Sequence, residues 1–164
     1  MDSAEFHAVY ERHARDVLRF AFYLCGDRSR AEEIAAETFA QAWSSIDPAR
    51  TSTLKAYLFS IARNLVRREL RRDSRRAELD GELQDPRPGP ASSAGDRLEL
   101  RAVLAALQRL PETDRAALLM RAQDGLSHEE IARVLGLSVV AVRVRIHRAR
   151  LRLLESKIRQ ERSP

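Results

Sequence analysis

The chain has 164 residues and a mass of 18.6 kDa, which is enough for one ordinary domain or two very small ones. Its 29 basic residues outnumber its 24 acidic ones, and the net charge of +5 at pH 7 favours an acidic partner, either nucleic acid or a membrane surface. Hydrophobic residues make up 44% of the chain and can supply a core, so disorder throughout is excluded.

The single cysteine, Cys25, cannot form an internal disulfide, and no cysteine or histidine pairs have the spacing of metal ligands. No apolar run approaches the roughly 20 residues that span a bilayer, and the first residues are too charged for a signal peptide. We therefore expect a cytoplasmic protein without membrane insertion. Neither a glycine-rich phosphate loop nor a catalytic triad is present in the sequence, so we expect no enzyme activity and no cofactor.

The pattern of helices and breaks predicts two domains. Residues 73–97 contain three of the six prolines and three of the six glycines, with few large apolar side chains, which is typical of a linker. Both flanking segments have helical periodicity throughout. The sequence thus predicts an all-α fold with two small helical domains, residues 1–72 and 98–164, joined by a flexible linker at 73–97.

Three helices are predicted in the first domain. Apolar side chains that recur every three or four residues over 6–24 predict the first helix, which Gly26 ends. The second is predicted over 29–45, with Ser29 as its N-cap. The third begins near Thr53, carries an apolar face and ends in a run of arginines.

The second predicted helix carries an unusual surface. Glu33 and Glu37 are four residues apart, and so are Phe39 and Trp43, which lie beside them off the main apolar line. An acidic and aromatic surface suits a protein partner. The alternative is that packing of the three helices buries both aromatic rings.

A basic stripe is predicted on the third helix. Arg63, Arg67 and Arg71 repeat every four residues opposite the apolar face, with Asn64 beside them, so all four are expected to face outward. Such a stripe fits either nucleic acid or a solvated surface whose arginines offset the helix dipole.

A helix-turn-helix is predicted over 127–150. Ser127 and Glu130 have the spacing of a capping box that opens a short helix, and Gly136 marks the following turn. Ser138 then caps a longer helix. A short helix, a tight turn and a longer helix are typical of this DNA-binding motif.

The last helix has a strongly basic outer face. Val142, Ile146 and Ala149 fall on the side expected to pack against the core. Five arginines lie between 143 and 152 without an acidic residue among them, so either a polyanion or solvent is expected to face them. The residues expected to meet a polyanion are Arg143, Val144, Arg145, His147 and Arg148.

Three segments, in this order, resemble the sigma-70 class of RNA polymerase sigma factors, of the small extracytoplasmic-function type. AEEIAAETFAQAW resembles the family's polymerase-binding segment, SIARNLVRRELRR resembles the end of its −10 recognition helix, and residues 110–150 resemble its −35 helix-turn-helix. The resemblance covers nearly the whole chain and implies a non-catalytic specificity subunit that directs core RNA polymerase to promoter DNA in response to a stress or signal.

The resemblance also implies roles for individual residues. Core polymerase would be bound by Glu33, Glu37, Phe39 and Trp43. The −10 element would be held by Arg63, Asn64, Arg67 and Arg71 together with the 45–53 loop, and the −35 element by Arg143, Val144, Arg145, His147 and Arg148. The family is commonly held by an anti-sigma factor, so we also expect an inhibitory protein partner.

Five positions depart from the family's usual pattern and put single contacts in doubt: Ala36, Tyr57, Arg68, Ala141 and Val144. Two alternatives therefore stay open. One is a promoter-binding helix-turn-helix regulator that works without polymerase, which Ala36 favours. The other is a helical protein whose basic stripe meets a membrane, although the arginine-rich helices lack a free bulky apolar face.

Overall fold

The structure is a computed structural model that describes residues 2–46, 54–80 and 94–162. The elements in these ranges are helices, as the predicted all-α fold requires. In chain order they are α1 (Ser3–Cys25), α2 (Arg28–Trp43), α3 (Leu54–Asp80), α4 (Ala94–Arg109), α5 (Glu112–Ala122), α6 (His128–Leu135) and α7 (Val139–Arg162).

Short polar residues and glycine set the helix ends of the first half. Gly26 ends α1 in a left-handed conformation with φ of 77°, as the sequence predicts. The N-cap of α2 is Asp27, whose side chain accepts a hydrogen bond from the backbone N–H of Arg30, at 3.1 Å. The prediction that Ser29 is this cap was wrong by two residues, because the carboxylate that follows the glycine reaches the open N–H groups first.

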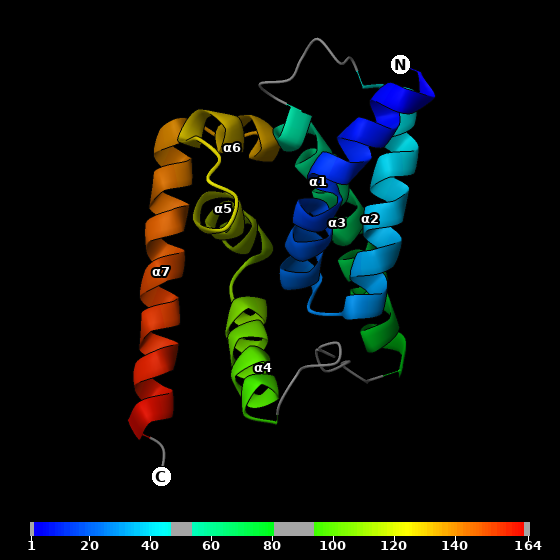
Figure 1. Ribbon diagram of the computed structural model, residues 1–164. Coiled ribbons are helices and arrows are strands. Elements are labelled where there is room, and N and C mark those ends of the chain that lie inside the picture. The colour runs from blue at the N-terminus through cyan, green and yellow to red at the C-terminus, as the bar shows by residue number, and fades with distance from the viewer. Residues whose placement is uncertain (1, 47–53, 81–93, 163–164) are drawn as a thin grey trace.

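Helices α1, α2 and α3 form a bundle (Figure 1), and two stacked aromatic rings lie in its core. Phe20 of α1 and Phe59 of α3 are fully buried, and their parallel rings have centroids 4.5 Å apart. Val17, Leu24 and Leu58 are buried with them. Each fully buried ring of this size removes a large apolar area from water.

The predicted helix-turn-helix is confirmed in the second half. The Ser127 hydroxyl accepts from the backbone N–H of Glu130 at 3.1 Å, and Gly136 ends α6 with φ of 67°. The Ser138 hydroxyl accepts from the backbone N–H of Ala141 at 3.1 Å at the start of α7. The inner side of α7 buries Val142, Ile146 and Ala149, which are the three residues that its periodicity places there.

The helices extend into both ends of the segment expected to be a linker. α3 continues to Asp80. Within this extension, Asp73 forms an ion pair with Arg30 of α2 and so joins α3 to the bundle. α4 begins at Ala94. The remainder of that segment, 81–93, lies outside the described residues, and so does Thr53, near which the third helix was predicted to begin.

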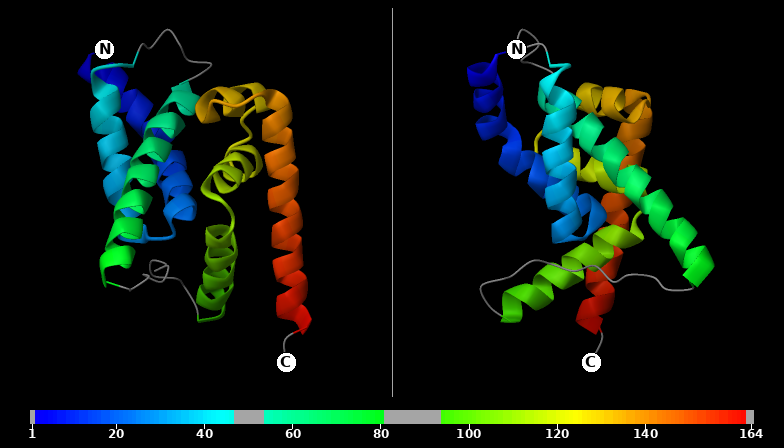
Figure 2. Two further views of the ribbon diagram at one scale, coloured as in Figure 1. Left: turned by 180° about the vertical axis from the view of Figure 1, so that it is seen from behind. Right: turned by 90° about the vertical axis from the view of Figure 1, so that its right-hand side faces the viewer.

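The two halves pack against each other (Figures 1 and 2). α5 and α6 lie between the first bundle and α7, which forms the far edge of the molecule. Gln108 of α4 donates from Nε2 to the carbonyl oxygen of Tyr23 at 3.1 Å, and Arg115 of α5 donates to that of Leu24. Side chains of the second half thus satisfy carbonyl groups at the end of α1. The sequence pattern does not reveal this contact, because it predicts two domains joined only by a linker.

A buried carboxylate lies at the same junction, in the turn between α5 and α6. The side chain of Asp124 is fully buried, and its Oδ1 lies 3.0 Å from Arg19 of α1 and 3.5 Å from Lys55 of α3. Both cations also approach Asp16, at 3.2 Å each. Oδ2 of Asp124 has no hydrogen-bond partner among the described residues. Burial raises the pKa of Asp124 despite the two cations.

We expect Asp124→Asn to stabilise the protein at pH 7. Because the pKa of Asp124 is higher in the folded than in the unfolded chain, its ionisation as pH rises favours unfolding. A neutral amide removes that cost, while Arg19 and Lys55 keep Asp16 as a partner. The gain should be about 1 kcal/mol at pH 7 and should shrink towards pH 4. Urea unfolding at both pH values measures it; a variant less stable than wild type at pH 7 would contradict the prediction.

Candidate nucleic-acid and protein interfaces

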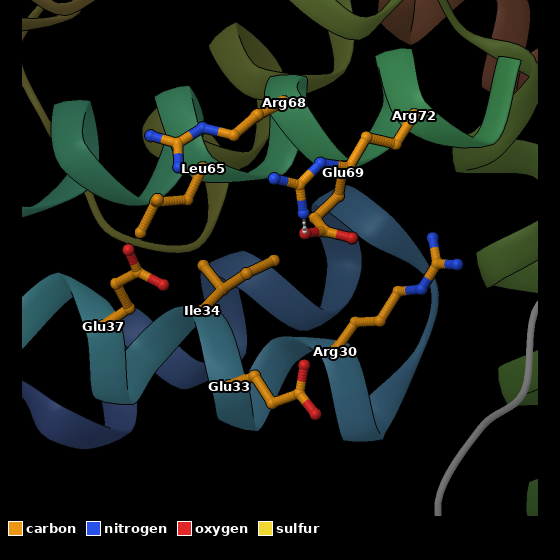
Figure 3. Close-up of a pocket in the computed structure, with 8 residues that line it drawn as sticks. All are labelled: Arg30, Glu33, Ile34, Glu37, Leu65, Arg68, Glu69 and Arg72. Carbon is orange, nitrogen blue, oxygen red and sulfur yellow. Dashed lines mark hydrogen bonds and ion pairs between the residues drawn. The ribbon is translucent and has the colours of Figure 1, made fainter. Parts of the chain in front are cut away.

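The predicted acidic surface of α2 borders a pocket between α2 and α3 (Figure 3). Glu33 and Glu37 are exposed and line it from α2. Arg68 and Arg72 line it from α3, so that opposite charges face each other across the opening. This arrangement offers a partner both charge signs within one groove, with the apolar side chain of Ile34 at its floor.

The two aromatic residues of this surface have different environments. Phe39 is only 4% exposed and packs edge-on against Tyr10 of α1, with ring centroids 5.0 Å apart. Trp43 is 44% exposed and lies edge-on against Phe6 of α1 at 4.3 Å. The prediction that Phe39 is a surface contact was wrong, because α1 covers it; the alternative of burial holds for this ring alone.

Two aromatic residues on α1 were missed as parts of this surface. Phe6 is partly buried and Tyr10 is 46% exposed, and both contact the aromatic rings of α2. Their periodicity marked them only as core-facing. The available signal was the length of the apolar stripe on α1, which extends past the fully buried positions towards the N-terminus.

The basic stripe on α3 is only partly at the surface. Asn64, Arg67 and Arg71 are exposed, as predicted. Arg63 is buried, and its guanidinium forms a bidentate ion pair with Glu112 of α5, at 2.8 and 2.9 Å. The prediction that Arg63 faces outward was therefore wrong, because the first turn of α5 packs over it and supplies its counter-ion.

The end of α2 lies close to the start of α3 at an exposed tyrosine. The hydroxyl of Tyr57 lies 2.7 Å from the hydroxyl of Ser45, and both residues are exposed. The hydrogen bond holds this ring beside Ser45, just after the end of α2. Residues 47–53 of the loop expected to contact DNA lie outside the described residues.

The outer face of α7 is exposed and carries the predicted mixture of arginine and valine. Val140, Val144, Arg143 and His147 are all exposed on the side away from α5. Because α7 forms the far edge of the molecule, the first bundle does not cover this face (Figure 1). A polyanion can reach it without any movement of the two halves.

Arg145 and Arg148 differ from this description, because both bind Asp114 of α5. Arg148 donates from Nε to Oδ2 at 2.9 Å and from Nη2 to Oδ1 at 3.0 Å. Arg145 donates from Nη1 to Oδ1 at 2.9 Å. The sequence predicts that only a polyanion or solvent faces these arginines. The structure adds a carboxylate from another helix, which neighbouring positions within α7 could not reveal.

The Asp114 carboxylate is ionised in this environment. Burial by itself would raise the pKa of Asp114, but the hydrogen bonds from Arg148 and Arg145 outweigh burial and lower it. The same hydrogen bond raises the pKa of Arg148. One negative charge is thus shared by two positive ones, and sequence reasoning missed Asp114 because an acid in the first turn of a helix is commonly explained by the dipole.

Comparison with known proteins finds relatives for both halves of the chain. The family description "Sigma-70 region 2" matches residues 9–76, and "Sigma-70, region 4" matches residues 100–153. The chain is 36% identical over 137 residues to the ECF RNA polymerase sigma factor EcfG of Rhodopseudomonas palustris, covering 82% of this chain and 75% of that one. It is 32% identical over 158 residues to SigL of Mycobacterium tuberculosis, covering 90% and 86%.

Two solved structures are also similar. The sigma factor RpoE of Bartonella quintana, in complex with the anti-sigma factor NepR, has a TM-score of 0.79 and 26% identity, covering 92% of this chain and 95% of that one. CnrH in complex with the cytosolic domain of CnrY has a TM-score of 0.71 and 29% identity, covering 96% and 89%. The likeness therefore extends over both helical halves.

These matches define a transcription factor of the sigma-70 class. More narrowly, the chain belongs to the extracytoplasmic-function RNA polymerase sigma factors, which confirms the resemblance seen in the sequence. Proteins of this family are transcription initiation factors that direct RNA polymerase to promoters. In the part of the chain that the structure describes, no helix is long and apolar enough to cross a membrane.

Proposed function

We propose that this sigma factor binds core RNA polymerase through α2 and reads promoter DNA with α3 and α7. The observation that carries the proposal is the exposed outer face of α7, where Arg143, Val144 and His147 lie on the second helix of a helix-turn-helix. A helix in this position of the motif enters the major groove, where arginine pairs with guanine and valine contacts the thymine methyl. The cytoplasm would be its site of action.

On the DNA side, each exposed basic surface would take one promoter element. Asn64, Arg67 and Arg71 of α3 would hold the −10 element, and the outer face of α7 would read the −35 element. Arg63 is unable to contact DNA while Glu112 occupies its guanidinium. We therefore propose that Arg63 joins the −10 contacts only when α5 moves away from α3.

On the polymerase side, the partner surface would consist of Glu33, Glu37 and Trp43, without the buried Phe39. Two exposed carboxylates beside an exposed indole allow both ion pairing and apolar burial. Ala36 is also exposed on this helix, and its methyl group can form no hydrogen bond with the partner. Binding to core polymerase would separate this function from that of a regulator that acts on DNA alone.

Glu37→Arg is expected to weaken core binding at least tenfold, because it reverses a charge in the centre of this surface. Titration of fluorescent protein with core polymerase measures the affinity. Glu11→Arg on α1 makes the same change of charge at another exposed position and should bind like wild type. Equal affinity of Glu37→Arg and Glu11→Arg would place the polymerase contact elsewhere.

An anti-sigma factor is the second partner that we propose. Of the structural relatives, RpoE was solved with the anti-sigma factor NepR bound, and CnrH was solved with the cytosolic domain of CnrY bound. This chain exposes Val140, Val144 and Leu151 together on α7, and apolar side chains in such a row favour a protein contact. A bound inhibitor there would cover the face that reads the −35 element.

A further inference from the structure

The buried carboxylate of Asp114, on α5, lies against α7 and is not itself exposed to DNA. Asp114 is fully buried, yet both of its oxygens accept hydrogen bonds from the two arginines that project from α7 towards α5. We propose that Asp114 is a positioning residue for promoter recognition, which fixes the guanidinium groups of Arg145 and Arg148 before DNA arrives and limits their attraction to any DNA. The inference rests on the proposed reading of the −35 element by α7.

The position of the arginine groups supports this role. Their side chains remain 32% and 44% exposed, although the carboxylate that holds them has no exposed surface. Each guanidinium therefore has one side on Asp114 and another side open to a ligand on the face of α7. Arg148 is bound along one edge, through Nε and Nη2, so its planar group cannot rotate freely and the direction of its remaining N–H groups is set in advance. Arg145 is held at Nη1 alone.

A purely structural tie between α5 and α7 is a poorer explanation. The two helices already share an apolar contact in which Met120 of α5 and Val142 and Ile146 of α7 are buried. A buried carboxylate adds a desolvation cost to that contact, and replacing such charges by apolar residues is often neutral or stabilising. The arginines would also bind phosphates more strongly without an acid beside them.

The weaker phosphate binding of arginines that lie beside an acid identifies what Asp114 contributes. Affinity for any DNA grows with the number of phosphates that the protein neutralises, whereas discrimination between sequences depends on directed contacts with base edges. Two free arginines would add two positive charges to the general attraction. With Asp114 between them the three groups carry a net charge of +1, so Asp114 lowers general attraction and keeps the directed contacts.

The test compares affinity for two DNA duplexes at several salt concentrations, using the full chain. One duplex is enriched by wild-type protein from a random-sequence pool, and the other is its scrambled version. Asp114→Asn keeps the shape of the side chain but removes its charge. We expect affinity for the scrambled duplex to rise about threefold, the ratio between the duplexes to fall about tenfold, and the salt slope to steepen by about one unit.

Two further variants separate position from charge. Arg148→Lys retains the charge but not the planar fork, so it should lower the ratio between the duplexes and leave the salt slope unchanged. Glu155→Gln removes one exposed negative charge from the same helix and should steepen the slope without changing the ratio. If thermal unfolding shows that Asp114→Asn is not folded, the ratio of affinities measured for Arg148→Lys tests the proposal in its place.

The outcomes are distinct. A folded Asp114→Asn variant that keeps the wild-type ratio overturns the role of Asp114, and so does a Glu155→Gln variant that loses the ratio equally. An Arg148→Lys variant with the wild-type ratio also overturns it. If wild-type protein enriches no sequence from the pool, the proposed reading of DNA by α7 fails, and this result is seen before any variant is made.

Discussion

Arg115→Ala is expected to lower the free energy of unfolding by about 3 kcal/mol, because it removes charged hydrogen bonds from a buried junction. Arg115 is buried and donates to the carbonyl oxygens of Leu24 and Leu110 and to Oε1 of Gln108. Burial lowers the pKa of Arg115, and the nearby C-terminus of α1 offers it a partial negative charge. Alanine would leave the carbonyls without these donors and open a cavity between the halves.

Urea unfolding followed by circular dichroism measures this loss. Arg121→Ala is a matched control, since Arg121 also lies on α5 but donates to the carbonyl of Leu126 within the second half. It should cost about 1 kcal/mol. If both variants lose the same free energy, Arg115 is not the main polar link between the halves. Two transitions in the Arg115→Ala curve would indicate that the halves then unfold separately.

The ion pair between Arg63 and Glu112 is expected to have a coupling free energy of about 2 kcal/mol. Both groups are largely shielded from water, and the pair is bidentate, which is the geometry that gives the strongest arginine–carboxylate contacts. Arg63→Met alone should cost about 3 kcal/mol, because it leaves the carboxylate of Glu112 without its main counter-ion. Glu112→Gln should cost less, since its amide oxygen still accepts from Arg63.

A double-mutant cycle of Arg63→Met and Glu112→Met gives the coupling, because each of these changes removes the ion pair completely. The exposed pair of Arg72 and Glu69 on α3 is the comparison, and its cycle should give less than about 0.5 kcal/mol. Additive losses at Arg63 and Glu112 would show that the buried pair contributes only packing. A large coupling supports an arrangement in which α5 must leave α3 before Arg63 can reach DNA.

Patterns that depend on near neighbours along the chain were enough to predict the helices and the motif. Ser127 and Gly136 set the two ends of α6, and Ser138 sets the start of α7, through hydrogen bonds with backbone groups within four residues. The inner face of α7 follows from its 3.6-residue period. The three segments that resemble sigma factors are likewise continuous in sequence. Family, fold class and the outer position of Val144 could therefore be predicted without coordinates.

The partners of charged side chains could not be predicted in this way. Arg63 and Glu112 are 49 residues apart in sequence, and Arg148 and Asp114 are 34 apart. The helical period gives the direction of a side chain relative to its own helix, but not which other helix packs there. The helical period therefore predicts that Arg63 is at the surface, whereas in the structure α5 covers it.

What the sequence by itself determined is the set of helices, the caps of the helix-turn-helix and the family. Only the tertiary structure decided that the two halves pack together, that Phe39 is buried while Trp43 is exposed, and that Asp114 binds two arginines of the reading helix. The physical reason is range. Caps and periodicity act over a few residues of one helix, whereas burial and ion pairing depend on surfaces that meet only when distant helices pack.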